Sequence, residues 1–283
     1  MPRFSMSEFS TLNRTFEEDV RGYAAGGAVG IGLAEGKLGS PSQDAAARAL
    51  LAEHGLAATI CLTSTLSILP TALGAEPAGV DERVASLSAS IRRLAAFEPA
   101  CVLVVTGAQG ERDAAAARAD VVAGLRELAG VAREAGVRIA LEPIHRSIND
   151  LFSLVGDLPG TEALLAEAST PDVGIIFDTW HLWDTPDVLD HVRRLAPRFP
   201  AVHINDWREP YRGWDDRVLP GDGVIDLPAL FGALEAGGYP ADGWFDLEIF
   251  STETYPDSLL KLPVDELTRR GREGFERAWA ARR

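Results

Sequence analysis

Four apolar runs in the second half of the 283-residue chain end on an acidic or imidazole side chain. Residues 173–177, VGIIF, are followed directly by Asp178, and VRIALEP, AVHIND and GWFDLEIF carry Glu142, His203 and Glu248 in the same way. Three carboxylates and one imidazole suit Mn²⁺, Mg²⁺, Co²⁺ or Zn²⁺ and leave positions open for substrate oxygens. Each residue alone could instead cap a helix or form an ion pair. Because four separate segments share the pattern, we expect one divalent metal site, with Mn²⁺ as the first candidate.

These runs have the composition of parallel strands that are buried on both faces. Elsewhere, similar runs alternate with segments of helical period, several of which begin after an N-cap residue or stop at a glycine. We expect strands at 4–10, 28–35, 58–64, 101–107, 137–143, 173–178, 201–206 and 243–250, and helices at 15–25, 41–54, 80–96, 114–135, 161–168, 187–195, 227–235 and 264–281. Eight βα units predict an α/β fold, a (β/α)8 TIM barrel, with an open doubly wound sheet as the alternative. In a barrel, the polar strand ends would gather at one face.

Length and composition fit a single domain over residues 1–283, since one such barrel usually needs about 250 residues and 46% of the chain is hydrophobic. The formal net charge of −15 argues against a nucleic-acid partner. No apolar run approaches the roughly 18 residues of a membrane span, and the N-terminus lacks the apolar core of a signal peptide. We therefore expect a soluble, cytoplasmic protein. Cys61 and Cys101 each lie in an apolar run, so we expect two buried thiols.

Strand alternation predicts which side chains share the barrel interior with the proposed ligands. The small residues Ala140 and Ala201 would lie below the polar strand ends and leave room above a filled floor. Asp246 would point inward two residues before Glu248. Because a buried carboxylate needs a partner, we take Arg138 on the fifth strand as the candidate.

Five segments, ALEP, FDTWH, VHIND, RVLPGDGVID and DLEIF, follow one another in this order. They resemble the successive motifs of the xylose-isomerase-like TIM barrel family of sugar phosphate isomerases and epimerases, and the resemblance covers nearly the whole chain. It implies a divalent metal ion held by Glu142, Asp178, His203 and Glu248.

The same resemblance implies substrate contacts and catalytic groups. His181, three residues after the aspartate of FDTWH, and Arg217, just before PGDG, would contact substrate oxygens. Glu142 and Glu248 would flank the bound sugar and serve as catalytic acid and base. The chain departs from many ketose epimerases of the family at Ile148, where they carry a further glutamate. This departure speaks against a ketose 3-epimerase.

Further side chains are expected near the mouth of the barrel. His145 could be a ligand, a general base or a solvated loop residue, and Glu35 or Lys37 could touch the substrate. Four tryptophans could wall a sugar's apolar face, pack the loops, or form a contact between subunits of a homo-oligomer: Trp180, Trp183, Trp207 and Trp214.

The leading functional hypothesis is a metal-dependent isomerase or epimerase of a sugar, keto-sugar or keto-polyol. Such a substrate could be an inosose, a hydroxypyruvate-like compound or a 3-keto sugar, reacting by proton transfer through an enediolate. A lyase or dehydratase would use the same metal but expel a substituent. A related DNA-repair endonuclease would need more than the five histidines present and a basic groove, which the net charge opposes. A non-catalytic metal-binding partner subunit is the remaining alternative.

Overall fold

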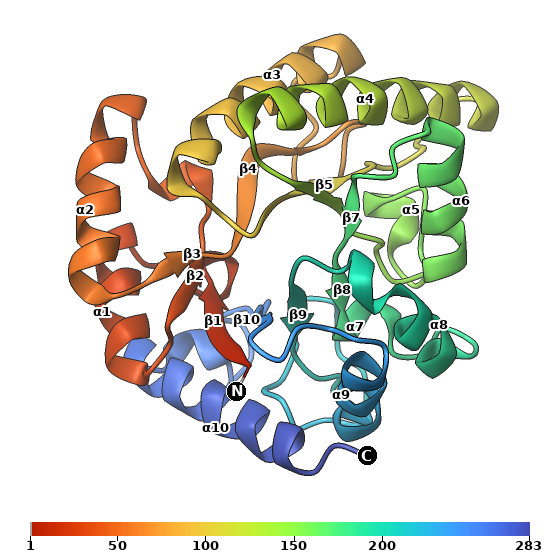
Figure 1. Ribbon diagram of the computed structural model, residues 1–283. Coiled ribbons are helices and arrows are strands. Elements are labelled where there is room, and N and C mark those ends of the chain that lie inside the picture. The colour runs from red at the N-terminus through yellow and green to blue at the C-terminus, as the bar shows by residue number, and fades with distance from the viewer. Residues whose placement is uncertain (1) are drawn as a thin grey trace.

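The computed structural model describes residues 2–283, in which short parallel strands form an inner ring and helices an outer one (Figure 1). The strands are β1 (Arg3–Ser7), β2 (Gly30–Gly32), β3 (Ala57–Ala58), β4 (Ile60–Ser67), β5 (Cys101–Val105), β6 (Ile139–Leu141), β7 (Gly174–Ile175), β8 (Phe177–Asp178), β9 (Val202–Ile204) and β10 (Trp244–Leu247). The helices are α1 (Phe16–Gly26), α2 (Asp44–His54), α3 (Val80–Leu94), α4 (Ala114–Ala135), α5 (Asn149–Phe152), α6 (Leu158–Ala168), α7 (Thr179–Leu182), α8 (Val188–Leu195), α9 (Leu227–Ala236) and α10 (Val264–Ala280). Within these residues, no helix is both long and apolar enough to cross a bilayer.

Strand pairing runs around a closed circuit, which confirms the predicted barrel. One sheet has the order β3-β2-β1-β10-β9-β8 and the other the order β4-β5-β6-β7. β3 and β4 are two parts of one barrel strand interrupted at Thr59, and β7 and β8 are two parts of another, interrupted at Ile176. The backbone amide of Ile176 still donates to Leu141 O at 3.0 Å, and that of Thr59 to Ile31 O at 2.9 Å. The two sheets are therefore continuous with each other, and all pairs are parallel.

The predicted helices are found close to their predicted bounds because their caps are encoded locally. Thr15 and Glu18 form a reciprocal capping box at the start of α1. Gly55 and Gly136 adopt a left-handed conformation at the ends of α2 and α4, where a side chain would be strained.

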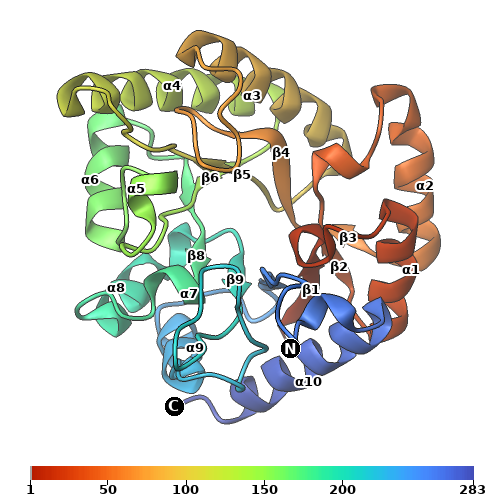
Figure 2. The same cartoon turned by 180° about the vertical axis from the view of Figure 1, so that it is seen from behind.

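Six predicted strands end two or three residues earlier than expected, and in the first two a 3₁₀ turn follows the strand. β1 stops at Ser7, whose hydroxyl accepts the backbone N–H of Phe9, and a 3₁₀ turn, η1 (Glu8–Thr11), follows. β2 stops at Gly32, and a second 3₁₀ turn, η2 (Glu35–Lys37), carries the residues expected at the strand end. Hydroxyl caps and short turns compete with the strand conformation at these points. The two one-turn helices α5 and α7, which lie in loops after strands, were not predicted (Figure 2).

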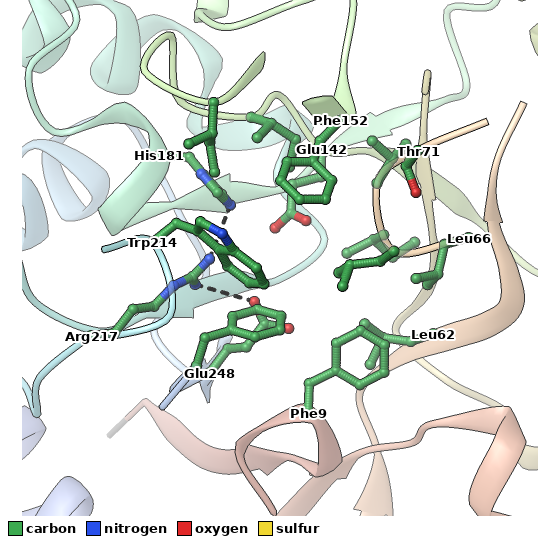
Figure 3. Close-up of a pocket in the computed structure, with 16 residues that line it drawn as sticks. Phe9, Leu62, Leu66, Thr71, Glu142, Phe152, His181, Trp214, Arg217 and Glu248 are labelled. Atoms are coloured by element: carbon green, nitrogen blue, oxygen red, sulfur yellow. Dashed lines mark hydrogen bonds and ion pairs between the residues drawn. The ribbon is translucent and has the colours of Figure 1, made fainter. Parts of the chain in front are cut away.

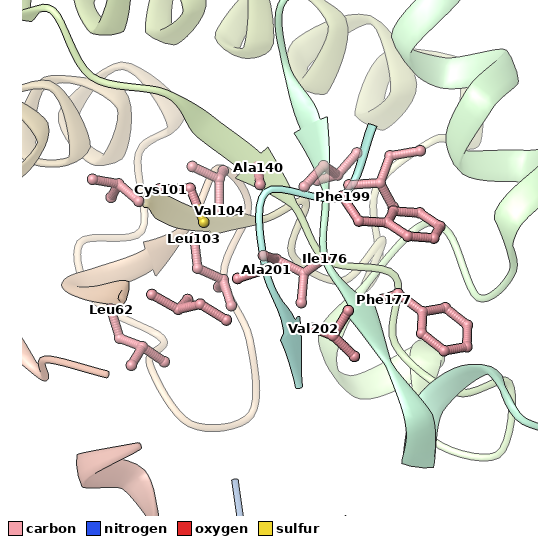
Figure 4. Close-up of a cluster of buried hydrophobic side chains, with 14 of the residues drawn as sticks. Leu62, Cys101, Leu103, Val104, Ala140, Ile176, Phe177, Phe199, Ala201 and Val202 are labelled. Atoms are coloured by element: carbon pink, nitrogen blue, oxygen red, sulfur yellow. The ribbon is translucent and has the colours of Figure 1, made fainter. Parts of the chain in front are cut away.

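Apolar side chains fill the barrel between the strands. Figure 4 shows Leu103, Ile176 and Ala201 turned toward the same interior space, and all three are buried. Cys61 and Cys101 are free, buried thiols, as predicted. This filled interior forms the floor on which the polar strand ends stand.

Candidate metal and substrate site

The four predicted metal ligands meet at the carboxyl ends of four strands. Glu142 directly follows β6, Asp178 ends β8, His203 lies within β9, and Glu248 directly follows β10. One ligand atom from each lies within 4.8 Å of the corresponding atoms of the other three, and all four residues are buried. Strand order brings them together, because β8, β9 and β10 are neighbours and β6 pairs with β7.

The imidazole of His203 has one nitrogen turned to the carboxylates. Its Nδ1 atom lies 2.8 Å from Glu142 Oε1, 3.7 Å from Glu248 Oε2 and 4.0 Å from Asp178 Oδ2. Burial alone would lower the pKa of His203, but Glu248 and Glu142 outweigh it and hold the pKa well above its ordinary value. A proton at Nδ1 thus occupies the place where three carboxylates converge.

The acidic groups are unevenly stabilised. Burial raises the pKa of Glu142 and raises that of Glu248 to about 7. Burial also opposes ionisation of Asp178, yet the nearby His181, Arg217 and His203 lower its pKa below the ordinary value. Three buried carboxylates so close together require positive charge. The donor set, three carboxylates with an imidazole, fits a divalent cation at this point.

Asp178 is fixed by contacts that leave one oxygen for the site. Its Oδ1 atom accepts the backbone N–H of Trp180 at 2.7 Å, which caps α7, and the side-chain amide of Asn205 at 3.1 Å. Asn205 also donates to the carbonyl of Glu248 at 3.2 Å. Asn205 therefore links two of the ligand-bearing strand ends, and the remaining oxygen, Oδ2, faces the cluster.

Asp246 lies beneath the cluster, but the predicted partner was wrong. Arg138 is exposed at the start of β6, whereas Asp246 is fully buried. The hydroxyls of Ser5 and Thr59 donate to Asp246 Oδ1. Its Oδ2 atom lies 3.6 Å from His203 Nε2, and neither atom has another partner among residues 2–283. Asp246 thus faces the side of His203 opposite the carboxylates, a contact that the spacing from Glu248 alone did not reveal.

His181 lies at the polar end of the cavity. Its Nδ1 atom accepts the backbone N–H of His145 at 3.1 Å, so the proton of the neutral ring belongs on Nε2. Burial lowers the pKa of His181 to about 3, which keeps the ring neutral at physiological pH. His181 lines the pocket beside Arg217: its Nε2 atom lies 3.2 Å from Arg217 Nη2 and 3.7 Å from Asp178 Oδ2.

Arg217 contacts both the pocket and the carboxylate cluster. Its Nη1 atom donates to Asp178 Oδ2 at 3.0 Å and to Glu248 Oε2 at 3.3 Å. The guanidinium also lies over the ring of Phe250, 4.6 Å from the centroid. The prediction placed Arg217 on the substrate alone, whereas the structure places it between the pocket and two of the proposed ligands.

The pocket beside this cluster encloses about 590 Å³, including its open mouth, and is lined by sixteen residues (Figure 3). Glu142, His181, Arg217 and Glu248 form its polar end. In Figure 3, the carboxylates of Glu142 and Glu248 approach the same space from opposite sides. Trp214, one of the four tryptophans expected near the mouth, also lines the pocket. The rest of the lining was not predicted: Phe9, Leu62, Leu66, Thr71, Leu73, Leu103, Val105, Ile144, Ile148, Phe152 and Phe250. Ile148 was singled out in the sequence, and it lies on this apolar wall.

Other candidates from the sequence lie outside the cluster. Glu35 accepts the Ser90 hydroxyl at 2.6 Å and lies 3.5 Å from Arg93, so its charge is used within the fold. Lys37 donates to Asp19 and to the carbonyl of Thr11. Neither Glu35 nor Lys37 is among the described residues that line the pocket.

His145 and three of the four tryptophans pack behind the site. The imidazole of His145 is buried, 3.2 Å from Asp184 and 2.7 Å from Ser147, so it is neither a solvated loop residue nor part of the metal cluster. Trp180 and Trp207 stack with ring centroids 4.6 Å apart. Trp183 packs on Trp207 with centroids 5.7 Å apart, and Trp214 is the tryptophan that reaches the described pocket lining. Packing of the loops is therefore the better interpretation for those three.

Comparisons with curated proteins identify relatives that include isomerases, an epimerase and dehydratases. The chain is 28% identical over 163 residues to an inosose isomerase of Bacillus licheniformis, covering 55% of this chain and 54% of that protein. It is 31% identical over 140 residues to an L-ribulose 3-epimerase of Mesorhizobium japonicum, covering 49% of this chain and 43% of that protein. It is 29% identical over 143 residues to an inosose dehydratase of Geobacillus thermodenitrificans, covering 45% of each. The chain thus spans about half the length of these curated relatives.

Solved structures share the architecture over the whole chain. Protein SMc04130 of Sinorhizobium meliloti has a TM-score of 0.84 at 25% identity, covering 97% of this chain and 98% of that one. The IOLI protein, whose crystal structure has a bound zinc atom, has a TM-score of 0.80 at 18% identity, covering 98% of both; this likeness shows the fold alone. The profile of one family matches residues 26–277. The chain belongs to the xylose isomerase-like TIM barrel family.

Proposed function

We propose that this protein is a divalent-metal-dependent isomerase or epimerase of a keto-sugar or keto-polyol, such as an inosose or a 3-keto sugar. The observation that carries the proposal is the convergence of four ligand atoms within 4.8 Å at the inner end of a pocket. The relatives named inosose isomerase and L-ribulose 3-epimerase support it. A cytoplasmic location and a small-molecule substrate belong to the same proposal.

Glu142, Asp178, Glu248 and the Nδ1 atom of His203 would hold the metal ion. Mn²⁺ is our first choice, because three of the four donors are carboxylates, with Mg²⁺, Co²⁺ and Zn²⁺ as alternatives. When bound, the ion supplies Lewis acidity, which polarises a carbonyl group and stabilises developing negative charge on its oxygen.

The residues of the chain would then bind the substrate and move its proton. His181 Nε2–H and the Arg217 guanidinium donate hydrogen bonds to substrate oxygens and so orient the ring. One of the two glutamates, Glu142 or Glu248, removes a proton from the carbon next to the carbonyl group. If the other returns a proton to the opposite face, that carbon is inverted; return to the neighbouring carbon gives isomerisation.

A lyase or dehydratase is the second candidate, and the relative named inosose dehydratase favours it. The reaction would begin with the same proton abstraction, but a glutamate would then protonate a departing hydroxyl group. The product would be unsaturated and would have lost water. Both candidates therefore require the same residues and differ in the fate of the proton and the leaving group.

The test is incubation of Mn²⁺-loaded protein with ketoses, inososes and 3-keto sugars in D₂O, followed by NMR. We expect a product of unchanged formula, usually with deuterium at the reacting carbon. Glu248→Gln should abolish the reaction, whereas Glu253→Gln, a matched change at an exposed glutamate, should not. Elimination to an unsaturated product would replace the isomerase proposal by the dehydratase. Metal binding without turnover of any compound would point to a non-catalytic subunit.

A further inference from the structure

The polar groups of the pocket are confined to one end. Four of the sixteen lining residues, Glu142, His181, Arg217 and Glu248, carry charged or imidazole groups, and they adjoin the metal cluster. Apart from the Thr71 hydroxyl and the Trp214 indole, the other lining side chains are hydrocarbon. Figure 3 shows His181 and Arg217 on one side and Leu62, Leu66 and Phe9 across the cavity. A ligand that fills the pocket therefore has a polar and an apolar end.

Aromatic rings form a continuous part of the apolar wall. Phe152 and Trp214 meet edge to face with centroids 5.6 Å apart, and Trp214 meets Phe250 at 5.5 Å. Phe250 in turn meets Phe9 at 5.9 Å. Such a row offers flat faces and edges that a planar or extended apolar group can pack against.

The mouth of the pocket also carries an exposed apolar side chain. Leu73 lines the pocket, yet 57% of it is exposed to solvent. It lies in the loop between β4 and α3. The preceding residue, Ala72, donates its backbone N–H to the carbonyl of Leu151 in α5 at 3.0 Å. A bound apolar group that covers Leu73 would remove this apolar surface from water, which favours binding.

A free sugar and a sugar phosphate both fit this wall poorly. Hydroxyl groups facing it would lose their hydrogen bonds to water with few partners in exchange. A phosphate would need a cation, and Arg217, the cationic residue of the described lining, already pairs with Asp178 and Glu248. The apolar wall thus selects against polar groups at the end away from the metal cluster.

We propose that the substrate is a keto-sugar or keto-polyol that carries an aromatic or alkyl substituent, and that the substituent packs against the wall formed by Phe9, Phe152, Trp214, Phe250 and Leu73. The keto-sugar part of this inference rests on the proposed function, whereas the apolar substituent rests on the pocket itself.

Two readouts on matched compounds test the inference. Titration calorimetry compares the binding of phenyl and methyl glucosides to Mn²⁺-loaded protein, and NMR in D₂O compares turnover of the corresponding 3-ketoglucosides. We expect the phenyl compounds to be favoured about ten-fold or more in both. Leu73→Asn should reduce the phenyl-to-methyl ratio several-fold. Leu12→Asn, an equally exposed leucine outside the described pocket lining, should not.

The outcomes separate this inference from the proposed function. Equal binding and turnover of phenyl and methyl compounds, or a preference for unsubstituted ketoses or inososes, would overturn the apolar substituent and leave the isomerase. Preferential binding of the phenyl glucoside without turnover of any keto compound would uphold the apolar subsite and overturn the isomerase. If Leu12→Asn lowered the phenyl-to-methyl ratio as much as Leu73→Asn does, the proposal that the substituent packs against the wall at Leu73 would also be overturned.

Discussion

His203 Nε2 lies 3.6 Å from Asp246 Oδ2, on the side of the ring opposite the 2.8 Å contact between Nδ1 and Glu142. A carboxylate behind an imidazole favours a proton on the nitrogen that faces it and so leaves the other nitrogen free to bind a cation. Asp246 is itself held by the Ser5 and Thr59 hydroxyls. Asp246 thus approaches the ring of His203 from beneath the cluster, at a separation longer than a hydrogen bond.

The first prediction is that Asp246→Asn weakens metal binding about 10- to 100-fold, because the ring of His203 loses its charged partner. Competition with a chelating dye measures the dissociation constant, and circular dichroism checks that the variant is folded. Asp242→Asn changes an exposed aspartate just before the same strand and serves as the control. An unchanged metal affinity in Asp246→Asn would contradict a role for Asp246 in positioning His203.

The second prediction concerns Arg217. Arg217→Ala should lower kcat/KM by tens to thousands of fold, roughly 2 to 4 kcal/mol, because a charged donor to the substrate is lost. Metal affinity should be equal or tighter, since the guanidinium competes with the ion for Asp178 and Glu248. Arg212→Ala, in the same loop, is the control, because Arg212 pairs with Asp216 and Asp257 instead. Loss of the ion from Arg217→Ala would show that Arg217 supports the metal rather than the substrate.

The third prediction is that metal affinity rises with pH, most steeply below neutrality. Burial raises the pKa of Glu248 to about 7, so this group holds a proton at lower pH and must release it to bind an ion. Below that value, affinity should fall about ten-fold per pH unit for each proton released; above it the rise should be shallower and continue, because His203, whose pKa is held well above its ordinary value, must also lose its Nδ1 proton. Calorimetry between pH 5.5 and 8.5, in buffers of different ionisation enthalpy, measures both the affinity and the released protons. A constant affinity with no proton release would refute the assignment of Glu248 as a ligand.

The fourth prediction concerns a buried acid away from the site. Burial raises the pKa of Glu8 to about 8, although Lys37 Nζ lies 3.9 Å away. A carboxyl group whose pKa is higher in the folded than in the unfolded chain contributes its full stabilisation at pH values below the unfolded-state pKa. That contribution is lost as the pH rises toward 8. Glutamine cannot ionise, so the Glu8→Gln variant does not lose this stabilisation. The Tm of the variant minus that of the wild type should therefore increase by about 2 °C or more from pH 5 to pH 8.5.

Thermal unfolding followed by circular dichroism at several pH values measures this difference. Glu17→Gln, an exposed glutamate in α1, should show no such trend. If the Tm difference between Glu8→Gln and wild type stayed constant with pH, Glu8 would be ionised throughout the range.

The proposed ligands could be located from the sequence because each ends an apolar run, and parallel strands bring such ends together at one face. The partner of Asp246 could not be located from the sequence. Alternation indicates which side of its strand a residue faces, but it does not give the register between that strand and its neighbours. Arg138 precedes β6 and lies outside the interior, whereas the register pairs Asp246 with Ser5 and His203.

Apart from Trp214, the aromatic residues of the pocket wall were missed for a different reason. Phe9 lies in a 3₁₀ turn and Phe250 in a loop, where no period indicates a direction. Their positions depend on contacts between distant segments, such as the Phe9–Phe250 packing. Local sequence patterns therefore predict the frame of the barrel and the groups on its strands, but not the shape of the cavity that the loops complete.

The lining of the pocket divides along the chain. Every lining residue up to position 105 is uncharged, from Phe9 to Val105, whereas Glu142, His181, Arg217 and Glu248 all follow it. Substitutions in the first half can therefore alter which compounds enter without touching the proposed metal ligands or proton-transfer groups. Evolution could retune selectivity in one half of such a barrel while the reaction in the other half stays the same, and a library randomised at Leu62, Leu66 and Leu73 would exploit this separation.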